Sequence, residues 1–140
     1  MKLEIVSPEK QLYSDEVDQI TVDTADGRIA ILPHHVNLFT KIKPGELKLT
    51  IGDKEQTLAV TGGFLEVSNN VVSILADYAI NAEDINVEKA IEAQKRAEEL
   101  LKKKEGQLSD VEYADLQAAL GRALLELKVA NQRRHKSSKN

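Results

Sequence analysis

The chain has 140 residues, of which 41% are apolar, and it contains no cysteine. This length suffices for one sizeable core, or for a core with an appendage, while disulfide bonds and thiolate metal sites are excluded. The net charge is −4, and no stretch approaches the roughly 20 apolar residues of a membrane span or resembles a secretory signal. We therefore expect a soluble, unprocessed chain.

Residues 1–80 alternate apolar and polar side chains with a period of two, and turn-forming sequences interrupt them every few residues. Leu3 with Ile5, and Ile20 with Val22, each put two apolar side chains on one face of a strand. Short strands separated by frequent turns are typical of an antiparallel sandwich or barrel. The sequence therefore predicts such a domain over residues 1–80.

The segment 26–35 combines a turn, an apolar strand and a stop. Asp26-Gly27 predicts a tight turn because glycine adopts a positive φ without a Cβ clash. Ile29–Leu32 then predicts a strand buried on both faces, and Pro33 ends it because proline has no N–H for the sheet. His34 and His35 are therefore expected on a loop at one edge of the sheet. Neighbouring side chains there point apart, so we expect no metal site.

Four further pairs of residues predict turns or irregularities in the sheet. Pro44-Gly45 is expected to turn the chain, and Gly52-Asp53 to form a two-residue hairpin loop. Asn69-Asn70 suits a type I′ turn because asparagine tolerates the left-handed region. Gly62-Gly63 indicates either a bulge or a place where another backbone approaches closely, and both interpretations stay open.

The hydrophobic period changes from two to 3.6 near Asn81, which predicts a hinge at residues 81–86. Asn86 is a suitable N-cap for a helix expected from Val87 to about Glu105. Ser109-Asp110-Val111-Glu112 is a capping box, so a second helix should start directly after a short loop. We therefore expect an antiparallel helical hairpin over residues 87–134 and a disordered basic tail at 135–140.

Apolar side chains recur every three or four residues along the second predicted helix, as in a coiled-coil seam. They are Tyr113, Leu116, Leu120, Ala123, Leu127 and Ala130. Leu124, Leu125 and Val129 broaden this surface beyond one seam. The second helix should therefore have a further apolar partner besides the first helix.

Charge is distributed unevenly along the chain. Residues 1–80 hold seven Lys and Arg against twelve Asp and Glu, whereas from Leu116 onward six basic residues are opposed only by Glu126. This basic end is either a solvated terminus or a contact with an acidic partner. Phosphate-binding glycine loops, zinc constellations and nucleophile motifs are absent. We therefore expect a chain that is not an enzyme by itself.

The combination resembles the epsilon subunit family of F-type ATP synthases, equivalent to the mitochondrial delta subunit. The resemblance rests on Gly27–His35, which is similar to G-E-[LM]-G-[IV]-L-P-[GN]-H, on Pro44-Gly45 before a strand, on Gly62–Val67 and on Ala82–Asn86. The chain departs from the first motif at Arg28, Ala30 and His34, where the family has an acidic residue, glycine, and glycine or asparagine.

The resemblance implies an α+β fold, with a sandwich of about ten strands followed by the helical hairpin. It implies a rotor subunit of the central stalk that couples rotation to catalysis in a proton- or sodium-translocating synthase, peripheral to the cytoplasmic face of a bacterial membrane. The sandwich would bind the gamma subunit and the polar loops of the c-ring. The hairpin would switch between folding on the sandwich and extending along gamma toward the alpha and beta subunits, where it inhibits hydrolysis.

The resemblance also implies which residues make these contacts. Those expected at the c-ring or gamma interface are Arg28, His34, His35, Gly62 and Gly63. Those expected to contact an acidic segment of the beta subunit are Arg122, Lys128, Arg133 and Arg134. We expect no metal and no tightly bound cofactor.

Some relatives bind ATP through a motif resembling [IL]-D-x-x-R-A, which this chain matches as Ile85–Ala90 with Asn86 and Lys89 at the Asp and Arg positions. Arg96 and Arg122 fall at further basic positions, whereas Glu126 stands where a binder has arginine. An ammonium lacks the bidentate fork of a guanidinium. ATP is therefore expected only as a weak regulatory ligand.

A free-standing adaptor whose tail binds nucleic acid is the alternative. Its tail would be Arg133-Arg134-His135-Lys136. The tail lacks interleaved aromatic residues and the chain is acidic overall, so we expect no nucleic-acid partner.

Overall fold

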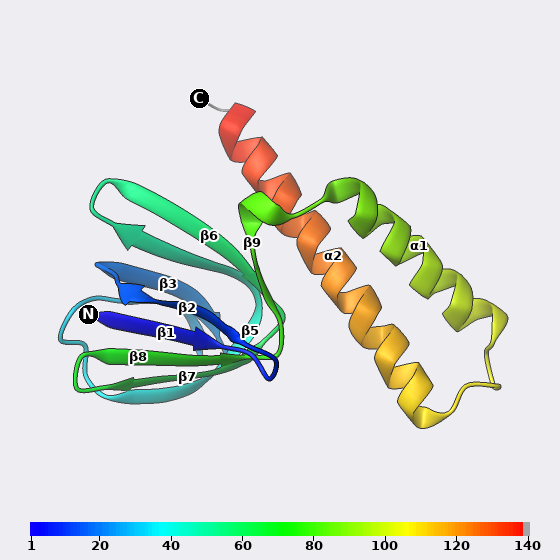
Figure 1. Cartoon of the computed structure of the whole chain (residues 1–140), viewed down its shortest axis with the longest axis horizontal. Helices are drawn as coiled ribbons and strands as arrows, with labels where there is room; N and C mark the ends of the chain where they lie inside the picture. Colours follow the sequence, from blue (N-terminus) through cyan, green and yellow to red (C-terminus); the bar gives the residue numbers. More distant parts are fainter. Residues whose placement is uncertain (139–140) are drawn as a thin grey trace. The chain divides into compact units, whose positions relative to one another are not determined.

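The computed structural model describes residues 1–138, with side chains for residues 1–134. It divides into two compact units, Met1–Glu83 and Asp84–Asn140, and this division falls inside the predicted hinge at 81–86. The first unit, which we call the sandwich, contains the strands, and the second, which we call the hairpin, contains two long helices (Figure 1). In the described part of the chain, no helix has the length and apolar character needed to cross a bilayer.

The sandwich has nine strands within its described residues, close to the predicted number. They are β1 (Lys2–Val6), β2 (Gln11–Glu16), β3 (Gln19–Thr24), β4 (Gly27–Ile31), β5 (Leu38–Ile51), β6 (Lys54–Val60), β7 (Gly63–Ser68), β8 (Val71–Ala76) and β9 (Ala79–Asn81), followed by the short 3-10 helix Ala82–Asp84.

Strand β5 is long enough to belong to both layers of the sandwich. Its first half pairs with β7 in the layer β2-β1-β8-β7-β5, and its second half pairs with β3 and β6 in the layer β4-β3-β5-β6-β9. All neighbours are antiparallel except β1 and β8, which run parallel. The pattern confirms the predicted sandwich, with one parallel pair that the alternation of side chains did not indicate.

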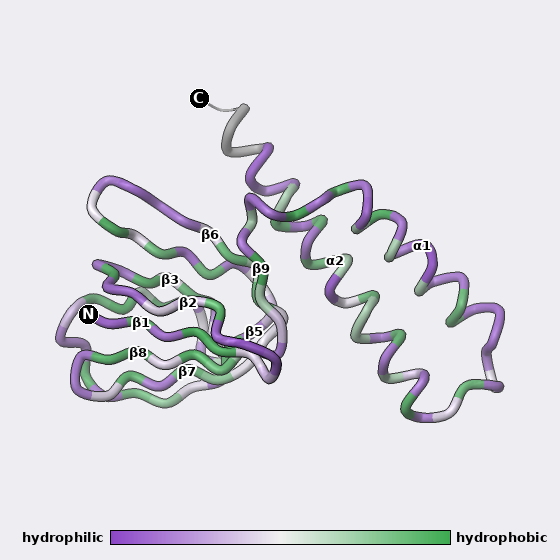
Figure 2. The backbone as a smooth tube through the Cα atoms, viewed as in Figure 1, coloured by the Kyte–Doolittle hydropathy of each residue, from purple (hydrophilic) through white to green (hydrophobic). Residues whose placement is uncertain are grey.

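The core lies between the two layers and consists of large aliphatic side chains. The hydropathy colours change along the strands as apolar and polar residues alternate (Figure 2). In β1, β3, β7 and β8 every second residue is buried, so one face of each of these strands is turned toward the core. The predicted inward residues Leu3, Ile5, Ile20 and Val22 are all fully buried. The largest other contributors are Ile31, Ile42, Leu47, Leu49, Leu65 and Ile74.

The prediction that Pro44-Gly45 turns the chain was wrong, because β5 runs straight through this dipeptide. Pairing with β7 ends at Ile42 and pairing with β6 begins at Gly45. Proline therefore sits where β5 passes between layers and its missing N–H leaves no gap in either ladder. A Cβ on Gly45 would lie 3.0 Å from the Asp23 carboxylate, which would have to shift slightly to make room for it.

The predicted strand at Ile29–Leu32 was only partly right. Strand β4 ends at Ile31, before Pro33 as expected, but only its inward side is buried, and Leu32 is 54% exposed. The reason is position: β4 is the edge of its layer and pairs only with β3. The turn also lies one residue earlier than predicted, at Ala25-Asp26, and Gly27 follows it with a φ of 115°.

Two other predicted turns are confirmed. Ile51 pairs with Lys54 across Gly52-Asp53, and Ser68 pairs with Val71 across Asn69-Asn70. Asn69 and Asn70 have φ values of 50° and 66°, as a type I′ turn requires. These turns depend on two residues each, so local sequence is sufficient to specify them.

The hairpin consists of α1 (Val87–Lys103) and α2 (Asp110–Ser138). The Asn86 side chain accepts a hydrogen bond from the Lys89 backbone N–H at 3.0 Å, which confirms the N-cap. The capping box is also confirmed, because the Glu112 backbone N–H donates to Ser109 Oγ at 3.1 Å and the Ser109 N–H donates to Glu112 Oε1 at 3.5 Å.

The predicted seam of α2 was correct in its middle and wrong at its start. Ala123 is buried, as are Ala90 and Ala97 of α1, whereas Tyr113 is 53% exposed. The Tyr113 hydroxyl accepts a hydrogen bond from Gln117 at 3.0 Å and stays at the surface. Helix α2 extends to Ser138 instead of ending at 134; residues 139 and 140 of the predicted tail lie outside the described residues.

Candidate interaction surfaces

The described part of the chain holds no group of three or more His, Asp or Glu side chains placed to bind a metal ion. The pKa of Tyr13 is raised above its usual value, first by burial and then by the nearby Asp15 carboxylate. Tyr13 packs against the sandwich core beside this carboxylate. The features that stand out are therefore surfaces, and we describe them one at a time.

The outer face of the layer β1-β8-β7-β5 carries a cluster of exposed apolar side chains, which we call the aromatic face. Phe39 is 67% exposed, Phe64 46% and Leu75 52%, and Val6 lies at the end of the same row. The two phenylalanine rings stack with centroids 5.8 Å apart and planes at 16°. Two neighbouring exposed aromatic residues on a flat sheet face are typical of a protein–protein contact.

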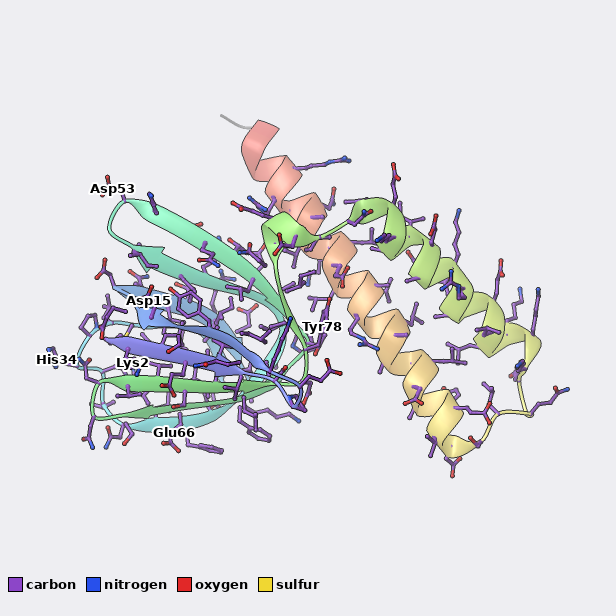
Figure 3. All side chains as sticks on the ribbon, viewed as in Figure 1. Lys2, Asp15, His34, Asp53, Glu66 and Tyr78 are labelled. Carbon is purple, nitrogen blue, oxygen red and sulfur yellow. The ribbon has the colours of Figure 1, made fainter. Side chains whose placement is uncertain are left out.

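The aromatic face encloses a shallow groove of about 290 Å³ with an acidic border. Its lining includes Glu4 and Glu66 beside the apolar side chains. In register, Glu66 lies opposite Phe39 and beside Ser73, and Glu4 lies beside Ser73 on the other side (Figure 3 labels Glu66). A partner for this groove would therefore present apolar side chains with a basic group near them.

Sequence reasoning missed the aromatic face, although a signal existed. In the stretch 63–68, Leu65 and Val67 define the inward phase, so Phe64 shares the outward phase with Glu66. In β5, Phe39 is likewise outward while Thr40 and Ile42 are buried. An aromatic residue in the polar phase of a strand is the pattern that would have indicated this surface.

The predicted interface residues lie at two opposite ends of the sandwich. Gly63 pairs with Ile42, Ile42 pairs with Thr24, and Thr24 pairs with Gly27 beside Arg28. His34 instead contacts Asn70, at the far end of β7, and Figure 3 shows it at the end of the sandwich away from Tyr78. The structure therefore brings Arg28, Gly62 and Gly63 to one end and separates them from His34 and His35.

At the first end, Arg28 contacts Asp23 with 3.4 Å between Nη1 and Oδ1, and both side chains are partly exposed. Gly62 and Gly63 have φ values of 131° and 147°, and a Cβ on Gly63 would lie 2.0 Å from the Leu75 backbone oxygen. Of the two open interpretations of this pair, close approach of another backbone fits Gly63, and that backbone is β8 of the same sheet.

At the second end, His34 has a left-handed φ of 65°, and its backbone N–H donates to Asn70 Oδ1 at 2.8 Å. His35 donates its backbone N–H to the Leu32 oxygen at 3.1 Å, closing a turn. Its ring Nδ1 lies 2.8 Å from the Val36 oxygen. The loop between β4 and β5 therefore has a defined shape, with Leu32 and Val36 pointing to solvent at 54% and 75% exposure.

The hairpin exposes basic side chains around a groove of mixed polar and apolar lining on the second half of α2. The groove has a volume of about 460 Å³ and is lined by Val87, Leu124, Leu127, Lys128, Ala130, Asn131 and Arg134. Arg122 and Arg133 are also exposed on α2. This basic border would suit an acidic partner.

Of the four residues expected to bind ATP, one has a structural role in the helix and the other three are exposed. Asn86 uses its side-chain oxygen as the cap of α1, while Lys89, Arg96 and Arg122 are exposed. Arg122 and Glu126 each make an interaction within the chain. Asn86 stands where the ATP-binding motif has aspartate, and its one side-chain oxygen already accepts the hydrogen bond that caps α1.

Two family models cover nearly all of the chain. Residues 1–82 match the ATP synthase delta/epsilon chain beta-sandwich domain, and residues 83–131 match the ATP synthase delta/epsilon chain long alpha-helix domain. The two matches meet in the segment where the structure divides into the sandwich and the hairpin.

Curated proteins that are similar to this chain carry the name ATP synthase epsilon chain. The one from Dehalococcoides mccartyi is 46% identical over 96% of this chain and 94% of its own length, and the one from Hydrogenovibrio crunogenus is 37% identical over 99% and 94%. Among solved structures, a chain of the Euglena gracilis mitochondrial ATP synthase OSCP/F1/c-ring assembly matches with a TM-score of 0.62 at 25% identity, covering 85% of this chain and 74% of that chain.

A chain of the Tetrahymena thermophila mitochondrial ATP synthase central stalk and c-ring shares the fold, with a TM-score of 0.57 at 14% identity over 92% of this chain and 95% of that one. The order of a sandwich and then a helical hairpin, the two matched family models and relatives that are similar over almost their full length agree with one another. The chain belongs to the delta/epsilon chain family of ATP synthase and is an epsilon subunit of the F type.

Proposed function

We propose that this epsilon subunit is a non-catalytic rotor component of the central stalk, which couples rotation of the c-ring to catalysis in a proton- or sodium-translocating synthase. It would act at the cytoplasmic face of a bacterial membrane, held there through the complex. The observation that carries this proposal is the aromatic face. Chains with the same fold occur in a solved central stalk with its c-ring and in a solved OSCP/F1/c-ring assembly. This supports a position of the subunit in the central stalk.

The aromatic face is the surface that we assign to the gamma subunit. An apolar patch with Phe39 and Phe64 stacked at its centre has the anatomy of an interface hot spot, in which a few aromatic anchors carry most of the binding free energy. Glu66 at its border adds charge selectivity, since a basic group of the partner can pair with it, whereas Glu4 already contacts Lys2 with 3.3 Å between Oε1 and Nζ. Both phenylalanines are exposed in the isolated chain and contribute little to its own fold.

The test is binding of the full chain to purified gamma subunit, measured by calorimetry. Replacing Phe39 and Phe64 each by alanine should weaken binding about 30-fold or more, because a buried aromatic anchor contributes about 2 kcal/mol or more. The matched control is Ile51→Ala, which removes an exposed aliphatic side chain from the other layer and should leave affinity unchanged. Wild-type affinity in both phenylalanine variants would remove the aromatic face from the interface.

We assign the two ends of the sandwich to contacts with the polar loops of the c-ring and with gamma. One carries Arg28 with Gly62 and Gly63, and the other carries the loop with His34 and His35. Their separation along β7 is consistent with two different neighbours. Arg28 favours an acidic or carbonyl-rich neighbour.

The hairpin is the element that we propose as a regulatory switch, extending toward the alpha and beta subunits to inhibit hydrolysis. Its separation as a compact unit supports a change of position without unfolding of the sandwich. The exposed Arg122, Lys128, Arg133 and Arg134 give it a basic surface for an acidic segment of the beta subunit. ATP would act on this unit as a weak ligand at most.

The test is a chain that ends at Asp84, compared with the full chain in the reconstituted complex. Because the unit Met1–Glu83 keeps the whole sandwich core, the short chain should bind gamma and support coupled synthesis. Hydrolysis by the complex should rise because the switch is absent. If the short chain folds but no longer joins gamma, the hairpin has a structural role and the switch is refuted.

A further inference from the structure

The loop between β4 and β5 and the turn between β7 and β8 hold each other through two asparagine side chains. Asn70 Oδ1, from the turn, accepts the backbone N–H of His34 in the loop at 2.8 Å. Asn37 Oδ1, from the loop, accepts the backbone N–H of Asn69 in the turn at 3.1 Å. Each segment therefore supplies the acceptor for the other, across 36 and 32 residues of sequence. We call this arrangement the asparagine clamp.

The clamp holds a left-handed residue in the loop. Asn69 and Asn70 have φ values of 50° and 66°, which suit their type I′ turn. His34 has a φ of 65° at the third position of the turn that the hydrogen bond between His35 and Leu32 closes, a position that favours glycine or asparagine. The hydrogen bond that the His34 amide donates to Asn70 Oδ1 holds this residue from outside its own turn.

The clamp also lies at the surface, so packing in the hydrophobic core does not explain why these asparagines contact each other's segments. Asn37 and Asn69 are exposed, and Asn70 is half-buried. Next to it, Leu32 and Val36 expose 54% and 75% of their surface. Exposed aliphatic side chains on a loop whose backbone is fixed from two sides form a preformed contact, because the entropy of ordering the loop has already been lost before a partner binds.

We propose that Asn37 and Asn70 are positioning residues, which keep the loop 32–36 in one shape for contact with the gamma and c-ring subunits. The inference rests on the proposed function, because that function assigns this loop to the stalk interface. If the loop occupied its binding shape only part of the time, the apparent dissociation constant would rise by the inverse of that fraction. The two hydrogen bonds of the clamp raise this fraction.

The first measurement uses the full chain alone and follows hydrogen exchange at two amides. Asn70→Gly removes the acceptor but tolerates the left-handed backbone, and it should speed exchange at the His34 amide at least tenfold. Asn37→Ala should do the same at the Asn69 amide. The matched controls are Asn70→Asp and Asn37→Asp, which retain an oxygen acceptor and should restore protection. Unchanged exchange in Asn70→Gly and Asn37→Ala would overturn the clamp.

The second measurement is affinity for a purified complex of gamma with the c-ring. Removing both acceptors should weaken binding severalfold with little change in melting temperature, and the aspartate variants should recover it. Leu32→Asp and Val36→Asp test the loop itself. If they weaken binding while the acceptor variants do not, the positioning role is refuted and the interface stands. If they too leave affinity unchanged, the loop is not in the interface, and both its place in the proposed function and the positioning role fall.

Discussion

Replacing Gly63 by alanine is expected to separate a structural role of this residue from a role in partner binding. The new Cβ would lie 2.0 Å from the Leu75 oxygen and 2.9 Å from the Ala76 Cα, both backbone atoms of β8. Strand β7 would have to move away from β8 to relieve this contact. Overpacking costs about 1–3 kcal/mol, and the φ of 147° adds about 1–3 kcal/mol for a residue with a Cβ.

The expected loss is therefore about 2–6 kcal/mol from a unit whose total stability should be about 4–12 kcal/mol. With a urea dependence of about 1–3 kcal/mol per molar for a domain of this size, the midpoint of unfolding should fall by roughly 1–6 M. Urea titration followed by the NMR amide signals of β8 reports on the sandwich separately from the hairpin, which matters because two units need not unfold together.

The control is Gly52→Ala, in the hairpin loop between β5 and β6. Gly52 also has a positive φ, of 60°, but a Cβ there meets no atom within 4 Å. Its loss should be only about 1–2 kcal/mol, the cost of the left-handed backbone alone. Equal midpoints for the two variants would refute the argument from backbone contact. If Gly63→Ala binds gamma with wild-type affinity at a temperature where it is folded, its role is structural only.

Three further predictions concern the charged surfaces. Arg28→Glu loses its contact with Asp23 and inverts the local charge, so it should weaken attachment of the soluble sector to the membrane sector at low salt, with a stability change within about 1 kcal/mol; unchanged attachment would exclude Arg28 from that contact. ATP should bind in the millimolar range or not at all, and micromolar affinity by calorimetry would contradict this. Joint replacement of Arg122, Arg133 and Arg134 by alanine should relieve inhibition of hydrolysis severalfold, and this relief should shrink as salt rises. Single replacements should do little because exposed ion pairs contribute only about 0.2–1 kcal/mol each. Full inhibition by the triple variant at low salt would point to Leu124 and other apolar contacts.

Features that depend on a few neighbouring residues were predictable from sequence. The two-residue turns at Gly52-Asp53 and Asn69-Asn70, the Asn86 cap and the Ser109–Glu112 capping box each involve groups at most three residues apart, and all have the expected geometry. The change of hydrophobic period likewise predicted a sheet and then helices. Each of these signals is local, so tertiary contacts had little opportunity to override it.

Features that depend on which strands become neighbours were not predictable in the same way. Pro44 ends a strand in most contexts, yet here it lies where β5 changes layers and no ladder needs its N–H. Ile29–Leu32 has the composition of a central strand, but β4 occupies an edge and leaves Leu32 exposed. The asparagine clamp joins residues more than 30 positions apart, so only the paired sheet brings its members together.

The two units differ in how they are stabilised, and this difference bears on which of them can act as a switch. The sandwich buries large side chains such as Leu3, Ile20 and Leu49 completely, whereas the buried face of α1 consists of Ala90 and Ala97. At about 25 cal/mol per Å² of apolar surface, alanine contributes far less than leucine or isoleucine. Elements that move in regulation come from the less stable part of a protein, and a free-energy difference of about 1.4 kcal/mol already changes a two-state population tenfold. On α2 the buried apolar side chains are Ala123, Leu125 and Val129. The described part of the hairpin therefore buries fewer large apolar side chains than the sandwich core, so that under the proposed switch the hairpin would change its neighbours while the sandwich keeps its shape.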